Sequence, residues 1–133
     1  MRVYIYLFFM IVCYLVSCKS KNQDQKVEES LFINFFETKH HFNDIPLNNP
    51  VDSFDFIFTN KGNRLLVILH AKTSCHCKKV KYSKAPIQPG DTSFVRVIYA
   101  GTRRSPEYFN KSVDIYSNAS NDIIKLHIDG NLK

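Results

Sequence analysis

Residues 54–59, with the sequence FDFIFT, decide the fold of this chain. Successive side chains of a β-strand point to opposite faces, so Phe54, Phe56 and Phe58 share one face of a strand. Burying each ring contributes roughly 1.5 to 3 kcal/mol, against a typical domain stability of about 5 to 15 kcal/mol. We therefore predict a strand whose phenylalanine face packs in a core.

Further strands are predicted on both sides of this segment. Residues 60–63 (NKGN) predict a hairpin turn, because Gly62 tolerates the positive φ that such turns need. Residues 64–71 (RLLVILHA) are apolar on both faces, which is typical of a strand in the middle of a sandwich. No window has apolar residues at helical spacing with caps. The sequence thus predicts an all-β fold, an antiparallel β-sandwich of six or so short strands, the others lying at residues 31–36, 94–99, 113–115 and 124–128.

The first eighteen residues predict export. Arg2 is their only charge, an apolar run extends from Val3 to Val16, and residues 15–18 read LVSC. A positive start, a short apolar run and a small residue before the cleavage point are typical of a secretory signal. As a helix this run would span about 21 Å, which is short of the roughly 30 Å hydrocarbon core. An uncleaved transmembrane helix is therefore the less favoured alternative.

Residues 15–18 resemble the lipobox of bacterial lipoproteins, in which a diacylglycerol is joined to the cysteine thiol and the chain is cut before it. The resemblance implies a signal peptide at residues 1–17 and lipidation of Cys18, whose acyl chains anchor the protein to a membrane. Ser20 is not the aspartate that resembles an inner-membrane retention signal, which favours the outer membrane of a bacterial envelope. The polar residues 18–30 then form a flexible linker, and residues 31–133 form one small domain.

The net charge of +6 bears on partners, since removal of the signal takes away only Arg2. An exported protein meets anionic lipids and polymers rather than nucleic acid. We therefore expect an envelope protein or an anionic polymer as partner and no nucleic acid, although solubility alone also explains the charge. After export Cys75 and Cys77 are the only free thiols, because Cys18 carries lipid, so the fold must rest on an apolar core.

The motif that could carry chemistry is KTSCHCKK at residues 72–79. Cysteines one residue apart close only a small, strained ring, and strained disulfides are reduced more readily. Nearby cations favour the thiolates of Cys75 and Cys77, which predicts a redox-labile pair. Residues 72–84 contain no acid, so the same run predicts a basic patch made of Lys72, Lys78, Lys79, Lys81 and Lys84.

Metal capture is a second interpretation of the same motif. A closed zinc site needs four ligands, and the local candidates are Cys75, His76, Cys77 and His70. Copper(I) needs fewer thiolates, so a transient copper site is less demanding. The alternatives are a redox pair, a copper or zinc site, and a structural role. No catalytic residue and no resident cofactor are expected.

A family resemblance is carried by residues 54–62, 66–68, 73–77, 86–90, 111–113, 116–118 and 126–130, with the cysteine pair as its most specific element. In these residues the chain resembles the exported domains of unknown function numbered fifteen seventy-three, related to Hydin-type immunoglobulin-like domains. His76 stands where that family usually has glycine. The resemblance implies an immunoglobulin-like β-sandwich in an envelope lipoprotein, with no established activity. A non-catalytic binding or scaffolding module is the expectation, and a thiol-disulfide redox or copper-handling protein is the alternative.

Substitution of Cys18 tests the anchor. Cys18→Ala removes the thiol that would carry the diacylglycerol, so we expect an unprocessed precursor or a mislocalised product. Mass spectrometry of the chain and membrane fractionation measure this outcome. Cys13→Ala, which changes a cysteine inside the apolar run, serves as the control and should be processed normally. Normal membrane fractionation of Cys18→Ala would contradict the prediction.

Overall fold

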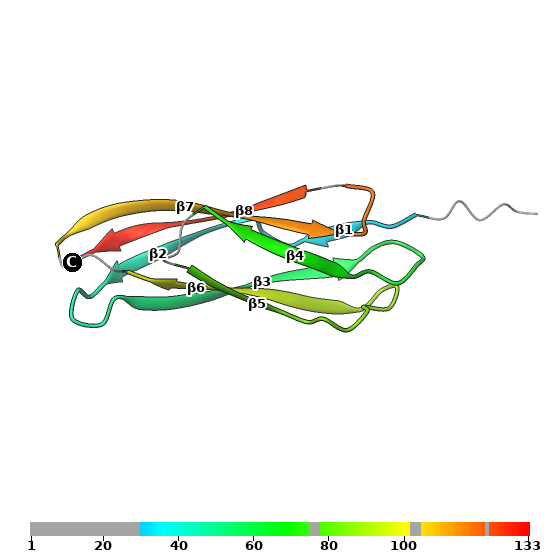
Figure 1. Cartoon of the computed structure of the whole chain (residues 1–133), viewed down its shortest axis with the longest axis horizontal. Helices are drawn as coiled ribbons and strands as arrows, with labels where there is room; N and C mark the ends of the chain where they lie inside the picture. Colours follow the sequence, from blue (N-terminus) through cyan, green and yellow to red (C-terminus); the bar gives the residue numbers. More distant parts are fainter. Residues whose placement is uncertain (1–29, 75–77, 102–104, 122) are drawn as a thin grey trace, which may run out of the picture.

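Two stacked β-sheets form the protein. The computed structural model describes residues 30–74, 78–101, 105–121 and 123–133, and no helix occurs among them. Sheet A has the spatial order β1 (Ile33–Phe35), β3 (Val51–Asn60), β6 (Thr92–Ala100) and β5 (Lys78–Tyr82). Sheet B has the order β2 (Lys39–Ile45), β8 (Ile123–Leu132), β7 (Glu107–Ser117) and β4 (Ile68–Thr73). The layers are seen in Figure 1, with β7 and β8 above β3 and β6. The predicted all-β, immunoglobulin-like sandwich is confirmed.

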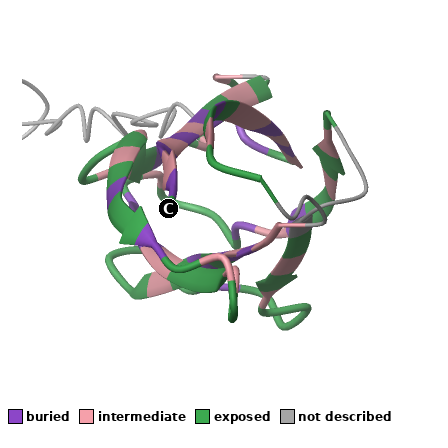
Figure 2. Cartoon of the chain, turned by 90° about the vertical axis from the view of Figure 1, so that its left-hand side faces the viewer, coloured by how far each residue is buried: buried purple, intermediate pink, exposed green. Residues whose placement is uncertain are grey.

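The core lies between the sheets and is built from alternate residues of each strand. Phe56 and Phe58 of β3 are completely buried, and Phe54 is half-buried, which confirms the predicted phenylalanine face. In the end-on view of Figure 2 the strands surround this common interior. The buried hydrophobic residues that the two longest pairings contribute are Phe56, Phe58, Val95, Val97 and Tyr99 from sheet A, and Phe109, Val113, Ile115, Leu126, Ile128 and Leu132 from sheet B.

The predicted hairpin at residues 60–63 is wrong, because β3 and β4 lie in different sheets. The connection between them crosses from sheet A to sheet B. Gly62 is needed there for close approach rather than for a positive φ, since a Cβ at this position would overlap the backbone of Ser30 and Phe32. The positive φ among the described glycines belongs to Gly90, in the connection from β5 to β6.

Asn60 organises this crossing through hydrogen bonds. Its side chain is fully buried, and its Nδ2 donates to the carbonyl oxygens of Arg64 at 2.7 Å and Ile87 at 3.0 Å. Its Oδ1 accepts from the Gly62 N–H at 3.0 Å, and its carbonyl accepts from the Gly90 N–H at 2.8 Å. One residue thus joins the connection between β3 and β4 to the connection between β5 and β6.

The strand predicted at residues 64–71 is present in part, but its predicted start and its central position are wrong. Strand β4 begins at Ile68 and forms an edge of sheet B, with β7 as its partner. The apolar residues of the predicted segment are therefore divided: Leu66, which precedes the strand, and Ile68 are buried, whereas Leu69 is 56% exposed. An edge strand of this sandwich needs only its inward face to be apolar. The prediction of a central strand was wrong because Leu69 is apolar although it faces outward.

Two strands were not predicted, and one of them changes the sheet type. Strand β2 is mostly polar, with Phe42 and Ile45 as its buried apolar residues, and β5 is rich in lysine. Strand β2 pairs parallel with β8, from Lys39 opposite His127 to Ile45 opposite Leu132. The other pairings are antiparallel, so sheet B is mixed rather than purely antiparallel.

Substitution of Phe56 tests the core. Phe56→Asp removes a fully buried ring and places a carboxylate in its position, so we expect a loss of at least about 5 kcal/mol and no folded domain. Circular dichroism and urea unfolding measure this loss. The control is Lys125→Glu, an exposed change whose ammonium lies 3.6 Å from Asp114, with an expected cost of about 1 kcal/mol or less. A stably folded Phe56→Asp chain would show that the register is incorrect.

Candidate functional site

Two edge strands meet on one side of the sandwich. Strands β4 and β5 follow each other in sequence but belong to different sheets, and they lie close to each other. Each has a sheet partner on one side only, β7 for β4 and β6 for β5. The free side of an edge strand presents backbone N–H and C=O groups that can pair with another chain.

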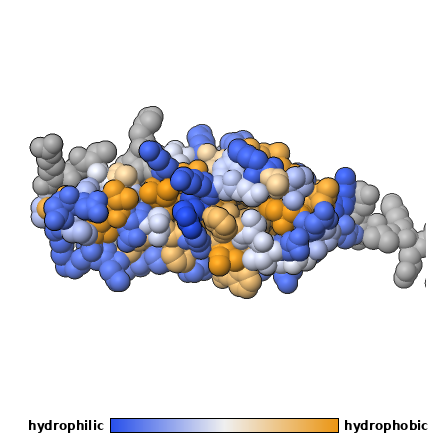
Figure 3. Space-filling view, turned by 90° about the horizontal axis from the view of Figure 1, so that it is seen from below, coloured by the Kyte–Doolittle hydropathy of each residue, from blue (hydrophilic) through white to orange (hydrophobic). Residues whose placement is uncertain are grey.

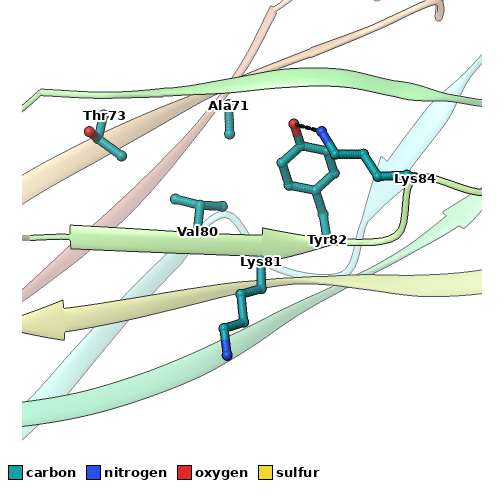
Figure 4. A pocket seen from close by; sticks show the side chains of 6 residues that line it. All are labelled: Ala71, Thr73, Val80, Lys81, Tyr82 and Lys84. Atoms are coloured by element: carbon teal, nitrogen blue, oxygen red, sulfur yellow. Dashed lines mark hydrogen bonds between the residues drawn. The ribbon is translucent and has the colours of Figure 1, made fainter.

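A groove of about 380 Å³ lies between these two strands. Figure 4 shows Val80 and Tyr82 pointing from β5 toward β4, whereas Lys81 points the opposite way. Val80 and Tyr82 are half-buried, so each adds apolar surface without being sealed in the core. The residues that line the groove are Ala71, Thr73, Val80, Lys81, Tyr82 and Lys84.

A backbone bridge joins the segment before β4 to the segment after β5. In this isolated bridge the Leu66 N–H donates to the Ile87 carbonyl at 3.0 Å and the Ile87 N–H donates back to the Leu66 carbonyl at 2.8 Å. The two hydrogen bonds thus link the connections that flank β4 and β5.

Lysines border this groove. Lys79 and Lys81 are exposed, and alternation along β5 places both on the outer face of sheet A, opposite Val80 and Tyr82. Lys72 is exposed on β4. The Lys84 ammonium donates to the Tyr82 hydroxyl at 2.8 Å and lies 4.3 Å from the centre of the ring. The predicted basic patch is therefore divided between the neighbouring edges of the two sheets, with Lys72 on β4 of sheet B and Lys79 and Lys81 on β5 of sheet A. Lys84 follows β5, and Lys78 begins it.

The charge of this edge is not neutralised within the part of the chain that the structure describes. Arg96 is the register partner of Lys81, but its guanidinium makes two hydrogen bonds of 2.6 Å to Asp55. These bonds hold the pKa of Asp55 below its ordinary value. No described carboxylate makes an ion pair with Lys79 or Lys81. Positive charge therefore remains along the outer side of β5.

The thiol pair lies outside the described residues. Cys75, His76 and Cys77 fall between β4 and β5, and the redox and metal interpretations stay predictions. His70, the fourth predicted ligand, is exposed on β4 and stacks on Tyr116 with ring centres 4.1 Å apart. In the described ranges no group of three or more His, Cys, Asp and Glu side chains is arranged to hold a metal ion.

The described ranges also hold no helix long and apolar enough to cross a membrane. Cys18 and residues 19–29 of the linker likewise fall outside them.

Two adjacent histidines occupy different environments on β2. His40 stacks on Phe54 of the facing sheet, with ring centres 3.6 Å apart. His41 points to the outer face, where its Nδ1 lies 2.6 Å from the Asp129 carboxylate. This hydrogen bond holds the pKa of Asp129 below its ordinary value. Burial lowers the pKa of His40, and the nearby Glu37 opposes that effect.

An apolar cluster that was not predicted lies on the outer face of sheet A. Ile57 and Phe94 are register partners and both are exposed, and Phe36, which donates its N–H to the Ile57 carbonyl at 3.0 Å, is 71% exposed. Figure 3, seen from the side of β3, β5 and β6, shows apolar patches between polar side chains on this face. The signal was present as apolar residues at outward positions of the strands, such as Ile57 between two inward phenylalanines.

Comparison with known proteins supports the fold. The family model described as Protein of unknown function (DUF1573) matches residues 33–132. Among proteins with curated descriptions, no sequence match is found.

Solved structures of low sequence identity share the sandwich. A protein of unknown function from Porphyromonas gingivalis W83 aligns with a TM-score of 0.64 at 11% identity, over 78% of this chain and 48% of that one. The ASH / PapD-like domain 7 of human CEP192 aligns with a TM-score of 0.61 at 8% identity, over 78% and 87%. The secreted serine protease VesC from Vibrio cholerae aligns with a TM-score of 0.53 at 13% identity, over 79% and 23%. This chain therefore spans about half of the first protein and less than a quarter of the protease, and these likenesses show the fold alone.

The environment of His40 predicts a pH dependence of stability. Because its pKa is lowered in the folded state, the unfolded chain binds the proton more readily. We expect the contribution of His40 to be complete above about pH 6.5 and to decline as the pH falls through this value toward the lower folded pKa. Thermal unfolding at pH 7.5 and pH 5.5 measures this. His40→Phe keeps a ring on Phe54 and should lose less stability between the two pH values; an equal loss in both chains would contradict the assignment.

Proposed function

Since the chain belongs to the DUF1573 family, whose description assigns no activity, we propose that it is a non-catalytic binding or scaffolding module anchored by lipid in a bacterial envelope. The matched residues cover the whole β-sandwich, from β1 to β8. The proposal therefore concerns the surfaces that this sandwich offers and the segment that precedes it.

The anchor is supported by residues 15–18 and by the polar segment after them. Lipid on Cys18 would place the domain close to a membrane surface, and residues 18–30 would separate the two. Two or three acyl chains give durable attachment without a membrane-spanning element. Ser20 favours the outer membrane as the site of attachment.

The observation that carries the binding role is the open edge between β4 and β5. Two strands with unpaired sides flank a groove, and exposed lysines border it. An unpaired strand edge in a sheet protein can aggregate unless charged side chains repel other strands or a partner covers the edge. A small sandwich recruits partners through such edges and the loops beside them.

Site-specific photo-crosslinking in intact cells tests this role. A photoreactive phenylalanine analogue replaces Lys84 beside the groove, and a matched chain carries it at Lys125 on the outer face of sheet B. We expect a discrete adduct with an envelope protein from position 84 and no such adduct from position 125. Absence of any protein or polymer adduct from position 84, in cells that hold the chain at the membrane, would contradict the binding role.

A thiol-disulfide or copper-handling activity is the second proposal. The Cys75-His76-Cys77 motif occupies the connection between two strands that carry lysines, and cations near a thiol favour its thiolate. Copper(I) can be bound by few thiolates, whereas a zinc site would need ligands beyond the motif.

A double substitution discriminates the two proposals. Cys75→Ser with Cys77→Ser keeps similar side-chain size and removes both thiols, so we expect unchanged crosslinking from position 84 and an unchanged melting temperature. Mass spectrometry of the wild-type chain before and after reduction, and after addition of copper(I), reports on the thiols themselves. Loss of crosslinking from position 84 in a folded double variant would show that the thiols are needed, and would favour the thiol activity over the binding module.

A further inference from the structure

The free side of β5 has the length and shape of a docking site for one extended segment. Strand β5 covers Lys78–Tyr82 and is paired with β6 on its other side. Five residues of strand extend about 17 Å, which is enough for several backbone hydrogen bonds to an added strand. The added strand would extend sheet A beside the groove that faces β4.

Alternation along β5 determines which side chains such a segment needs. Positions in line with Val80 and Tyr82 face the groove, where Ala71 supplies further apolar surface. Positions in line with Lys79 and Lys81 face solvent on the outer side of sheet A. Side chains on neighbouring strands meet others of the same face. A matching segment therefore alternates apolar residues, directed into the groove, with acidic residues, directed toward the lysines.

The charge of the edge also disfavours a second copy of the chain. If two β5 strands paired, lysines would lie opposite lysines, and like charges directly opposite are destabilising. Arg96, beside Lys81, is already bound to Asp55, so an incoming carboxylate would meet lysines without a described acidic competitor.

We propose that β5 binds, by strand addition, an extended segment of a partner protein in which acidic and apolar residues alternate. The inference rests on the proposed binding function and names the chemistry of its partner. Backbone hydrogen bonds along β5 supply affinity, and Lys79, Lys81 and the groove supply selectivity. Lys84, held on the ring of Tyr82, closes the edge at the end of β5 and is placed to meet one further carboxylate.

Fluorescence anisotropy with synthetic peptides tests the proposal. The probe is a fluorescein-labelled peptide in which glutamate and valine alternate over six positions, titrated with the full chain in detergent. We expect saturable binding that weakens as salt is added. A peptide of the same composition, with three glutamates followed by three valines, should bind at least about tenfold more weakly, because only alternation satisfies both faces. Equal binding of the two peptides, or equal displacement by a sulfated polysaccharide, would indicate simple attraction to a polyanion and overturn strand addition.

Two further measurements separate strand addition from charge attraction. In an added strand, the N–H groups of alternate residues face β5 and the others point away. One peptide is therefore methylated on its valine nitrogens and a second on its glutamate nitrogens. We expect one of these two peptides to lose binding and the other to keep it. Loss in both or in neither would contradict pairing with β5. In the protein, Lys79→Glu with Lys81→Glu should weaken binding at least about tenfold. Lys39→Glu with Lys125→Glu makes the same charge change on sheet B and should leave binding unchanged.

Peptide binding and crosslinking from position 84 together distinguish a failure of strand addition from a failure of the binding function. If the alternating peptide fails to bind while crosslinking from position 84 persists, the module binds a partner of other chemistry. If both fail, the binding function itself is wrong. Thermal unfolding of each lysine variant confirms that a loss of binding does not reflect a loss of fold.

Discussion

The packing of alternate apolar side chains between the two sheets determines which residues of the described strands face solvent. Phe56 and Phe58 are wholly enclosed, and a slip of one residue would turn them to solvent and turn their polar neighbours inward. The same constraint acts on β5, where Val80 and Tyr82 face the sandwich interior. Lys79 and Lys81 therefore face outward as a consequence of core packing, and the basic edge follows from the apolar core.

A buried polar residue, Asn60, joins two connections between strands. Asn60 has its amide satisfied by three backbone groups, and these lie on two different connections. It holds Arg64 and Ile87 near each other, and the Leu66–Ile87 bridge joins the same two connections. Loss of a buried amide leaves unpaired carbonyls, which is costly in a dry interior. The joining of the connections after β3 and β5 thus depends on a buried polar side chain.

Local patterns in the sequence predicted much of the fold, and the errors have physical causes. The phenylalanine stripe was predictable because alternation reports directly on burial. The turn at Gly62 was misassigned because a local turn pattern does not say whether the chain stays in one sheet or crosses to the other. Strand β2 was missed because its partner, β8, is 88 positions away and only two of its residues are buried as apolar side chains. The lysine run was visible in the sequence, whereas the groove beside it depends on β4 and β5 joining separate sheets.

The parallel pairing of β2 with β8 has a consequence for how the chain acquires its structure. Strand β8 lies between β2 and β7, so sheet B has no continuous ladder until residues 123–132 have been synthesised. Contacts between such distant segments make folding slow, because a large loop must close before they form. The middle of sheet B is therefore assembled last, when β8 enters between the already synthesised β2 and β7.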